Sequence, residues 1–493
     1  MRPAVLLGEG VTFFLLVKTT FMVEDDANVE KLAAPRVPEK VSSRLPSFVS
    51  NLMSLLGGQA ACAVVAFGTQ ICYARLLGPF GRGQVSLCLM AIAAGALIGA
   101  LGGELPLIVW TAKSRNEPAH WLSAVMFWGF LGSGTASCLW ALLYWGWHPV
   151  FLKGITDHLA VFILLSIPVS ILLSYFMAIL TGMERFQLRA GLSFLTHFAS
   201  LAALLVLVFL YGRTSEMAIL GVLAGSLIAI IAISVLIKRF LAPAWAVLPR
   251  RDKLREALSL GLRGQLGNLA TFLNYRLDVF IVNYLLDPGQ VGVYALGVAV
   301  SEAIWQIPQA VALALFPRTA RTLNEGASEF TCVVLRQVLL VSCVSGFALA
   351  ILSPLFVPLI FGVQFSSSVS VIWWILPGTV ALSLGKVMSV DLAARSKPEL
   401  SSIFAFCALA VTLVLDVALI PRMGIQGAAL ASSAAYFLDT ALLAIALKRE
   451  LKVTWAFLLV PTRAEFASYQ QAWLGCKARF WPAALAESSG RGD

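Results

Sequence analysis

The segment LLGPFGRG at residues 76–83 returns as LLDPGQVG at residues 285–292, and this recurrence decides the fold. At a spacing of 209 residues, the matched positions pair Pro79, Gly83 and Leu87 with Pro288, Gly292 and Leu296. A second match, Lys238-Arg239 with Lys448-Arg449, has a spacing of 210 residues. Because two separate points along the chain keep nearly the same spacing, we infer two copies of one structural unit.

Around these segments the chain is strongly apolar. Of its 493 residues, 59% are hydrophobic and only 13% are charged, and the mean hydropathy is +0.85. Soluble globular proteins carry about 25% charged residues. The composition therefore excludes a disordered chain, a secreted disulfide scaffold and an ordinary cytosolic enzyme.

The apolar residues fall in separate stretches, each long enough to cross a bilayer core of about 30 Å as a helix. Twelve spans are predicted, at residues 47–73, 85–109, 119–146, 158–181, 191–211, 216–237, 259–286, 291–316, 333–361, 366–393, 401–420 and 426–446. The predicted fold class is an all-α polytopic membrane protein with about 12 transmembrane helices in two six-helix lobes. Because six is even, both lobes point the same way, and a pseudo-twofold axis along the membrane normal leaves a cavity between them.

These spans divide the chain into five predicted parts. They are an N-terminal extension (1–46), an N-lobe of helices 1–6 (47–237), a cytoplasmic linker (238–258), a C-lobe of helices 7–12 (259–447) and a cytoplasmic tail (448–493). We expect the extension to be flexible. In the tail, helical spacing of Phe466, Tyr469, Trp473, Lys477 and Phe480 predicts a helix lying on the membrane surface.

Basic residues in the short loops predict the orientation. Loops after even-numbered spans carry fourteen Lys and Arg residues, and loops after odd-numbered spans carry five. Because basic loops stay in the cytoplasm, both termini are expected there. Half of the net charge of +10 is thus a topology signal, and we expect no nucleic-acid partner.

The loops leave no room for an enzyme domain. The longest loop between spans, residues 238–258, has 21 residues, and the chain contains no Walker A, GxSxG or HExxH motif. The eight cysteines form no CxxC pair, and seven lie in or beside apolar segments. We therefore expect a transporter with no catalytic residues, no metal site and no cofactor.

Ionisable residues inside spans are costly, which makes them candidates for function. Arg276 lies ten residues before Leu286 and Glu302 lies eleven after Val291, so both are predicted about 15 Å inside the periplasmic end. They can therefore meet, either as a buried pair that only neutralises two charges or as part of the transport path. Asp278 is about 200° around the helix from Arg276, so it faces elsewhere.

Three more candidates lie near the cytoplasmic ends of their spans. These are Arg263, Glu104 and Lys386. The two cations could bind an anionic headgroup that enters from the cytoplasm. The alternative for Arg263 and Lys386 is that their side chains reach out to the membrane interface.

Several motifs in a fixed order carry a family resemblance. They are Ala74 through Pro79 with Gly83, Tyr275-Arg276-Leu277-Asp278, Leu285 through Pro288 with Gly292 and Tyr294, Glu302 through Pro308, Leu315 through Arg318, and Leu419 through Ala429. Over residues 47–447 the chain resembles the polysaccharide-transport branch of the multidrug/oligosaccharidyl-lipid/polysaccharide exporter superfamily, the O-antigen-type flippases. It departs from the family at Asp416, where relatives often have asparagine, and in its 46-residue leader.

The resemblance implies two six-helix bundles in a V with alternating access to a central cavity. It implies a lipopolysaccharide-type cargo, an undecaprenyl-pyrophosphate-linked oligosaccharide, moved to the periplasmic leaflet of a bacterial inner membrane. Membrane lipids and H⁺ or Na⁺ are the other expected partners. The alternatives are a cation-coupled multidrug exporter of the same superfamily, with Glu104 or Asp278 exchanging the ion, and a membrane-embedded polysaccharide polymerase or ligase.

Overall fold

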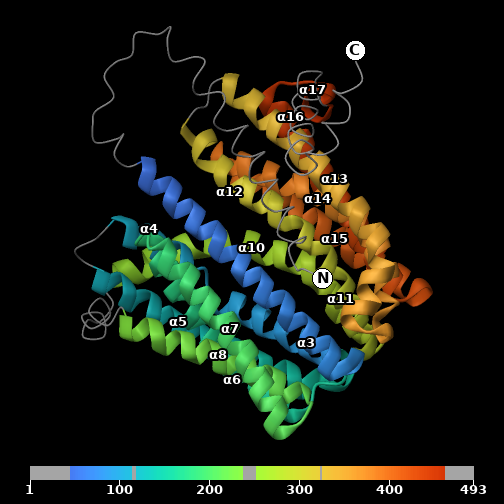
Figure 1. The fold of residues 1–493 in the computed structure, drawn as a ribbon. Coiled ribbons are helices and arrows are strands. Elements are labelled where there is room, and N and C mark those ends of the chain that lie inside the picture. The colour runs from blue at the N-terminus through green and yellow to red at the C-terminus, as the bar shows by residue number, and fades with distance from the viewer. Residues whose placement is uncertain (1–44, 114–117, 237–250, 322–324, 461–493) are drawn as a thin grey trace, which may run out of the picture. The chain divides into compact units, whose positions relative to one another are not determined.

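The computed structural model describes residues 45–113, 118–236, 251–321 and 325–460, and every regular element in these ranges is a helix (Figure 1). This confirms the predicted all-α fold class. The chain forms two compact units, Val49–Thr454 and a second made of Met1–Phe48 with Trp455–Asp493. In the second unit, α17 (Trp455–Leu459) is a single short helix. The predicted surface helix through Phe466 and Phe480 lies outside the described residues, as does nearly all of the N-terminal extension.

The first half of the large unit consists of long helices joined by short turns. They are α3 (Leu45–Gly99), α4 (Glu104–Lys113), α5 (Pro118–Phe151), α6 (Asp157–Gly182), α7 (Phe186–Tyr211) and α8 (Ser215–Leu236). Within α3, Gly78 has φ 69° and ψ −175°, a left-handed-side conformation that suits glycine and breaks the helix into two spans before Pro79. The second predicted span breaks again between α3 and α4, where Gly102 has φ 70°.

The second half repeats this pattern. Its helices are α10 (Arg251–Leu285), α11 (Pro288–Glu302), the 3₁₀ turn η1 (Ala303–Trp305), α12 (Gln306–Arg321), α13 (Glu325–Phe361), the 3₁₀ turn η2 (Val363–Phe365), α14 (Ser368–Ala394), α15 (Pro398–Met423) and α16 (Ile425–Leu451). Asp287 caps α11, because its Oδ1 accepts hydrogen bonds from the backbone N–H groups of Gly289 and Gln290. Since α10 begins at Arg251, the last residues of the predicted linker are helical.

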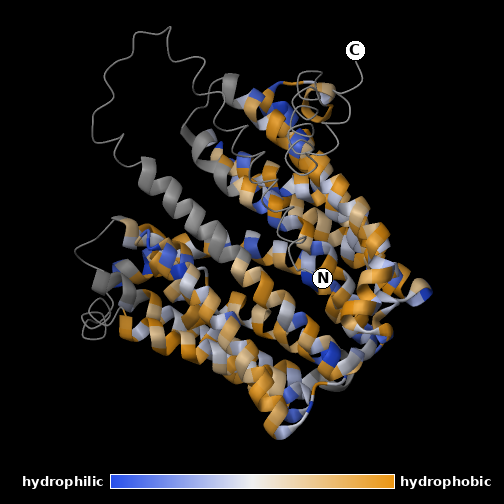
Figure 2. Ribbon diagram, in the orientation of Figure 1, coloured by the Kyte–Doolittle hydropathy of each residue, from blue (hydrophilic) through white to orange (hydrophobic). Residues whose placement is uncertain are grey.

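Ten helices in the described part of the chain are long and apolar enough to cross a membrane. The difference from twelve predicted spans has two causes. Residues 61–99 count as one helix although Gly78 kinks it, and α10 is too polar to be included. Along the ribbon, hydrophobic residues cover most of the helices (Figure 2). The chain is a multi-pass membrane protein.

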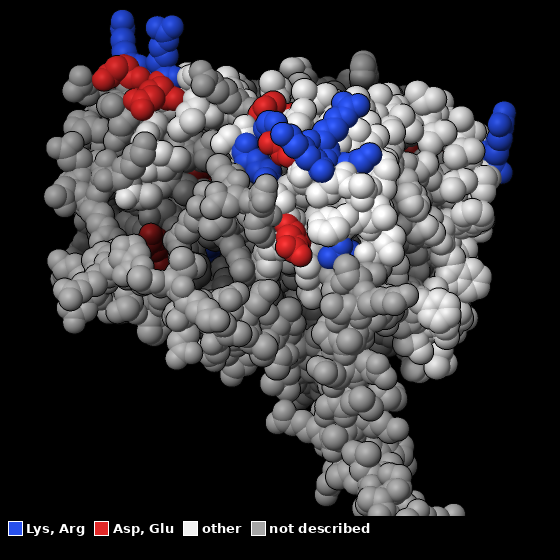
Figure 3. Space-filling view, turned by 90° about the horizontal axis from the view of Figure 1, so that it is seen from above, with Lys and Arg blue, Asp and Glu red and all other residues white. Residues whose placement is uncertain are grey.

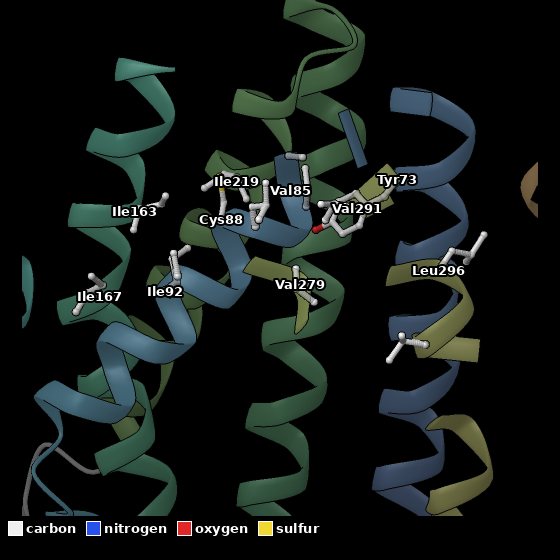
Figure 4. Close-up of a cluster of buried hydrophobic side chains, with 14 of the residues drawn as sticks. Tyr73, Val85, Cys88, Ile92, Ile163, Ile167, Ile219, Val279, Val291 and Leu296 are labelled. Carbon is white, nitrogen blue, oxygen red and sulfur yellow. The ribbon is translucent and has the colours of Figure 1, made fainter. Parts of the chain in front are cut away.

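Helix contacts within the large unit form two groups. In the first half α6 contacts α4, α5 and α8, and α7 packs along α8; in the second half α14 contacts α11, α12, α13 and α16, and α15 lies between α10 and α16. A buried apolar cluster joins the halves. In Figure 4, Ile92 of α3 lies toward Ile163 and Ile167 of α6, and Val85 lies close to Val291 of α11.

The repeated segments of the sequence meet face to face. A Cβ atom added to Gly83 would lie 1.7 Å from the carbonyl oxygen of Pro288, and one added to Gly292 would lie 1.9 Å from that of Pro79. The contact is thus reciprocal between equivalent residues, as a local twofold axis requires. The repeat read from the sequence is therefore also a packing relation, and only glycine fits at either crossing.

Hydrogen bonds between the two halves reinforce the contact near the two repeated segments. The Arg82 guanidinium, 2% exposed, donates from Nε to the carbonyl of Gly292 (3.3 Å) and from Nη1 to that of Gln70 (3.0 Å). Arg75 donates from Nε to the carbonyl of Ile360 (2.8 Å), and Lys153 donates to that of Tyr284 (2.7 Å). Arginines counted from the sequence as loop residues therefore hold the two halves together.

Helix α10 contacts both halves of the unit. Its first part lies against the first half: Gly261 packs on the backbone of Gly102, and Trp128 Nε1 donates to the carbonyl of Leu254 (3.1 Å). Its second part lies against α15 and α11. The helix that carries Arg263, Arg276 and Asp278 therefore connects the two halves.

Candidate functional site

The predicted partners Arg276 and Glu302 form an ion pair between α10 and α11. Both terminal nitrogens of the guanidinium are engaged, Nη1 donating to Oε1 (2.8 Å) and Nη2 to Oε2 (2.7 Å). The side chains are 28% and 15% exposed. The meeting expected from equal depths is confirmed, and the pair keeps an accessible side.

A lysine lies beside this pair in an aromatic box. The Lys386 ammonium of α14 is 4.2 Å from the ring centre of Trp305 and 4.9 Å from that of Tyr275. Tyr436 of α16 closes the box, with ring centres 5.7 Å from Tyr275 and 5.8 Å from Trp305. Cation–π attraction of this kind is strongest where water is excluded. Lys386 therefore points into the protein and not to the membrane interface.

A break in span eight positions these groups. Glu302 is the last residue of α11, and the 3₁₀ turn η1 follows with Trp305 at its end. The indole Nε1 of Trp305 donates to the carbonyl of Thr379 on α14 (3.0 Å). Interrupted helices commonly form binding sites in transporters because they turn side chains and free backbone groups into the interior.

Asp278 lies in a separate polar cluster. Its Oδ2 accepts hydrogen bonds from the hydroxyl of Tyr294 and from Ser432 Oγ (3.1 Å), and its Oδ1 accepts from the N–H of Val279 (2.8 Å). It is 1% exposed. Arg276 and Asp278 thus face different neighbours, as their 200° separation predicts.

Asp416 of α15 is a buried carboxyl without a hydrogen-bond partner. It is fully buried, and neither oxygen has a partner among the described residues. It interacts electrostatically with Asp278 across the helix contact. One turn away, Thr412 Oγ1 donates to Asn274 Oδ1 (3.0 Å), and the Asn274 amide nitrogen is unpartnered.

Asp391 of α14 shows the contrasting case of a satisfied carboxylate. It is also fully buried, but it accepts hydrogen bonds from Thr319 (3.0 Å) and Thr331 (2.9 Å) and pairs with Arg395 (2.7 Å). Asp391 is therefore a helix-packing group. Buried polar groups are nearly always satisfied in this way, so the two free oxygens of Asp416 need an explanation of another kind.

The remaining predicted site residues lie elsewhere. Glu104 is exposed at the start of α4. Arg263 lies in α10, in the segment where Gly261 packs on the turn between α3 and α4 and Gly264 faces Leu105 of α4. The structure therefore brings together Arg276, Glu302 and Lys386, with Asp278 in the adjacent cluster.

Sequence reasoning missed several residues of these clusters. From the sequence, Asp416 stands out as a departure from the family and as an aspartate within a span that is expected to pack helices or cap one, and the ring system of Tyr275, Trp305 and Tyr436 does not stand out. No group of three or more His, Cys, Asp or Glu side chains is arranged to hold a metal ion within the described ranges. Among the residues that Figure 3 describes, most of the surface is uncharged, Lys and Arg side chains are grouped with acidic neighbours, and further charged atoms lie recessed.

Comparison with known proteins identifies the family. Residues 48–323 match the family model described as polysaccharide biosynthesis protein. The chain belongs to this family. No curated protein sequence matches the chain.

Several solved structures share the fold of this chain. The lipid II flippase MurJ, in an inward closed conformation, is 14% identical with a TM-score of 0.66, covering 87% of this chain and 99% of its own. A mutant of the Vibrio cholerae MATE transporter VcmN is 14% identical with a TM-score of 0.61, covering 84% and 99%. A MOP-superfamily transporter from Pyrococcus furiosus is 12% identical with a TM-score of 0.61, covering 83% and 95%. The resemblance noted in the sequence is confirmed at the level of family and fold.

Proposed function

We propose that this protein is a flippase for lipid-linked oligosaccharides, the precursors of polysaccharide, and that it works by alternating access. The carrying observation is the polysaccharide biosynthesis family match, over a chain with the fold of transporters. A similar structure is described as a lipid II flippase. The proposal is transport without covalent change, not polymerisation or ligation.

The interior charges fit an anionic headgroup. An undecaprenyl-pyrophosphate cargo carries its negative charge where lipid and sugar meet, so it needs cations inside the membrane. Arg276 offers a planar fork that matches phosphate oxygens, and Lys386 offers a point charge beside it. Both are held by aromatic and acidic neighbours from three helices.

The second cluster supports coupling to a cation. Two aspartates, Asp278 and Asp416, share one buried region, and Asp416 has two oxygens free to receive a proton or to bind Na⁺. Hydroxyl groups of Ser432 and Thr412 are nearby oxygen ligands of the kind hard cations prefer. We propose that this cluster, and not Glu104, exchanges H⁺ or Na⁺.

The proposed location is the bacterial inner membrane, with both termini and the 238–258 segment in the cytoplasm. The basis is the excess of basic residues in loops after even-numbered spans. The crossing of Pro79 and Gly292 then lies at the periplasmic end, where it closes the path between the two halves.

A flipping assay tests the proposed function. Purified full-length protein in proteoliposomes should move a fluorescent undecaprenyl-pyrophosphate oligosaccharide between leaflets, measured by accessibility to a membrane-impermeant quencher. Arg276→Gln should abolish this movement. Lys397→Gln is the matched control, because Lys397 pairs with Glu450 at a partly exposed position away from the site. Unchanged flipping by Arg276→Gln in correctly folded protein would refute the assigned headgroup site.

The second candidate function is cation-coupled drug export. It is favoured by the fold shared with the MATE transporter VcmN and by the buried Asp278–Asp416 cluster. Under that function, Asp416→Asn would abolish drug resistance conferred by the protein, and lipid-linked oligosaccharide would not move. Measuring both cargoes in the same proteoliposomes separates the two functions.

A further inference from the structure

The Arg276–Glu302 pair occupies the groups that a headgroup would need. The two terminal nitrogens of the guanidinium, Nη1 and Nη2, which form its end-on fork, are bound to the two oxygens of Glu302. A carboxylate and a phosphate present oxygens to this fork in the same bidentate way. Without cargo, therefore, the cation already holds an anion that belongs to the protein itself.

The pair is also open to replacement. Arg276 keeps 28% and Glu302 15% of its side-chain surface exposed. In the Asp391–Arg395 pair, by contrast, the Asp391 side chain is fully buried. Glu302 ends α11 at the break in span eight, so its backbone continues in a 3₁₀ turn and not in α-helix. Helix ends fray more readily than the middle of a helix, so the position of Glu302 can shift.

Lys386 gives the site a second positive charge. Within the described residues no carboxylate lies within salt-bridge distance of its ammonium, which is held by the rings of Trp305 and Tyr275. It is close enough to Glu302 to interact with it electrostatically. The three side chains together carry one net positive charge, so a headgroup with two negative charges meets two cations and one competing anion.

We propose that Glu302 is a built-in competitor of the cargo headgroup: it occupies Arg276 until a pyrophosphate replaces it, and it returns to expel the headgroup at release. This proposal rests on the proposed function and assigns Glu302 a role in it. A tethered group acts at high effective concentration, so a singly charged anion cannot displace it, whereas a pyrophosphate that engages both cations can. The same competition keeps cargo affinity low enough for release.

Binding measurements test the competition directly. Full-length protein in nanodiscs is titrated with farnesyl pyrophosphate by microscale thermophoresis. Glu302→Gln should bind at least tenfold more tightly than the unmodified protein, and Arg276→Gln should not bind. The double variant Arg276→Gln/Glu302→Gln replaces the pair with two neutral groups and should fold without binding. Glu450→Gln, which breaks the pair with Lys397, is the matched control and should leave affinity unchanged.

The rate of transport is a second measurement, and it should change in a way that a purely structural role of Glu302 would not produce. In the flipping assay, Glu302→Gln should turn over at least tenfold more slowly although it binds more tightly, because the headgroup is no longer expelled. Should Glu302→Gln not fold, Glu302→Asp keeps the charge but is one methylene too short for the bidentate contact, and it should bind several-fold more tightly than the unmodified protein.

The outcomes separate cleanly. Folded Glu302→Gln or Glu302→Asp with affinity equal to or below that of the unmodified protein would overturn the proposal. If the unmodified protein flips the oligosaccharide but the Glu302 variants do not bind farnesyl pyrophosphate more tightly, the proposed function is supported and the competitor role of Glu302 is refuted. If the affinities change as predicted but the unmodified protein does not flip the oligosaccharide, the competitor role of Glu302 is supported and the proposed cargo is refuted.

Discussion

The crossing of α3 and α11 offers the sharpest test of the structure. An alanine at Gly83 would place its Cβ 1.7 Å from the carbonyl oxygen of Pro288, where ordinary contact begins at 3.4 Å. The two helices must therefore separate by about 1.7 Å, the difference between these distances. Overpacking of this kind costs about 1–3 kcal/mol.

Converted to an equilibrium, this cost lowers the population of the closed crossing by about 5- to 140-fold. Hydrogen–deuterium exchange measured by mass spectrometry on the full chain reports it. Peptides covering residues 76–87 and 286–296 should exchange faster in Gly83→Ala, and Gly292→Ala should give the same pattern, because the contact is reciprocal. The Arg82 bond to the Gly292 carbonyl should open with it.

A matched control lies in the same helix. Gly68 has no atom within 4 Å of an added Cβ, so Gly68→Ala should leave exchange at both peptides unchanged. If Gly83→Ala exchanges like Gly68→Ala, the two repeat segments do not cross as described.

Four further changes have defined outcomes. Either single reversal, Arg276→Glu or Glu302→Arg, should cost about 3–5 kcal/mol of stability because it leaves like charges facing each other. The double exchange should restore most of the lost midpoint temperature of thermal unfolding. A double variant no more stable than the less stable single variant would contradict the pair. Asp416→Asn should preserve folding but remove dependence of transport on the imposed ion gradient, and persistence of that dependence would exclude Asp416 from coupling. Arg263→Ala should abolish glycan export at normal protein abundance, with partial rescue by lysine, which keeps the point charge; normal export would mean that Arg263 only contacts lipid. An alkaline phosphatase fusion after residue 250 should be inactive, since the predicted location is cytoplasmic, and activity there would reverse the topology.

Most of the fold could be predicted from the sequence because a bilayer imposes simple rules. Span length, even helix number and the repeat at residues 79–83 and 288–292 together led to the observed helices. What could not be predicted were the breaks. The 3₁₀ turn after Glu302 and the glycine at 102 interrupt apolar stretches that read as continuous helices. Such breaks depend on neighbouring helices, which a single stretch of sequence does not contain.

The site was only partly predictable for a related reason. Counting residues from the periplasmic turn placed Arg276 and Glu302 at one depth, and the structure confirms their contact. The same count puts Asp278, Asp416 and Ser432 each eight residues from a turn, about 12 Å deep, so it could have grouped them as well. Tyr275 and Tyr436 lie eleven and twelve residues from their turns, so the count also puts these two rings near the depth of Glu302. Trp305 lies fourteen residues from its turn, at the end of the 3₁₀ break that the sequence does not reveal, so the count does not show that the three rings form one box.

The position of α10 has a consequence for how the protein can be divided. By sequence this helix opens the second repeat, yet its first part packs on Gly102 and Trp128 of the first. A cut in the chain before Arg251 would therefore yield two fragments of which neither is complete, the first lacking the surface that covers these residues. Co-expressed fragments should find each other through this helix, and a fragment that also carries α10 should be the more soluble form of the first half in detergent. The second repeat thus begins at the start of α10, whereas a stable fragment of the first half ends after α10.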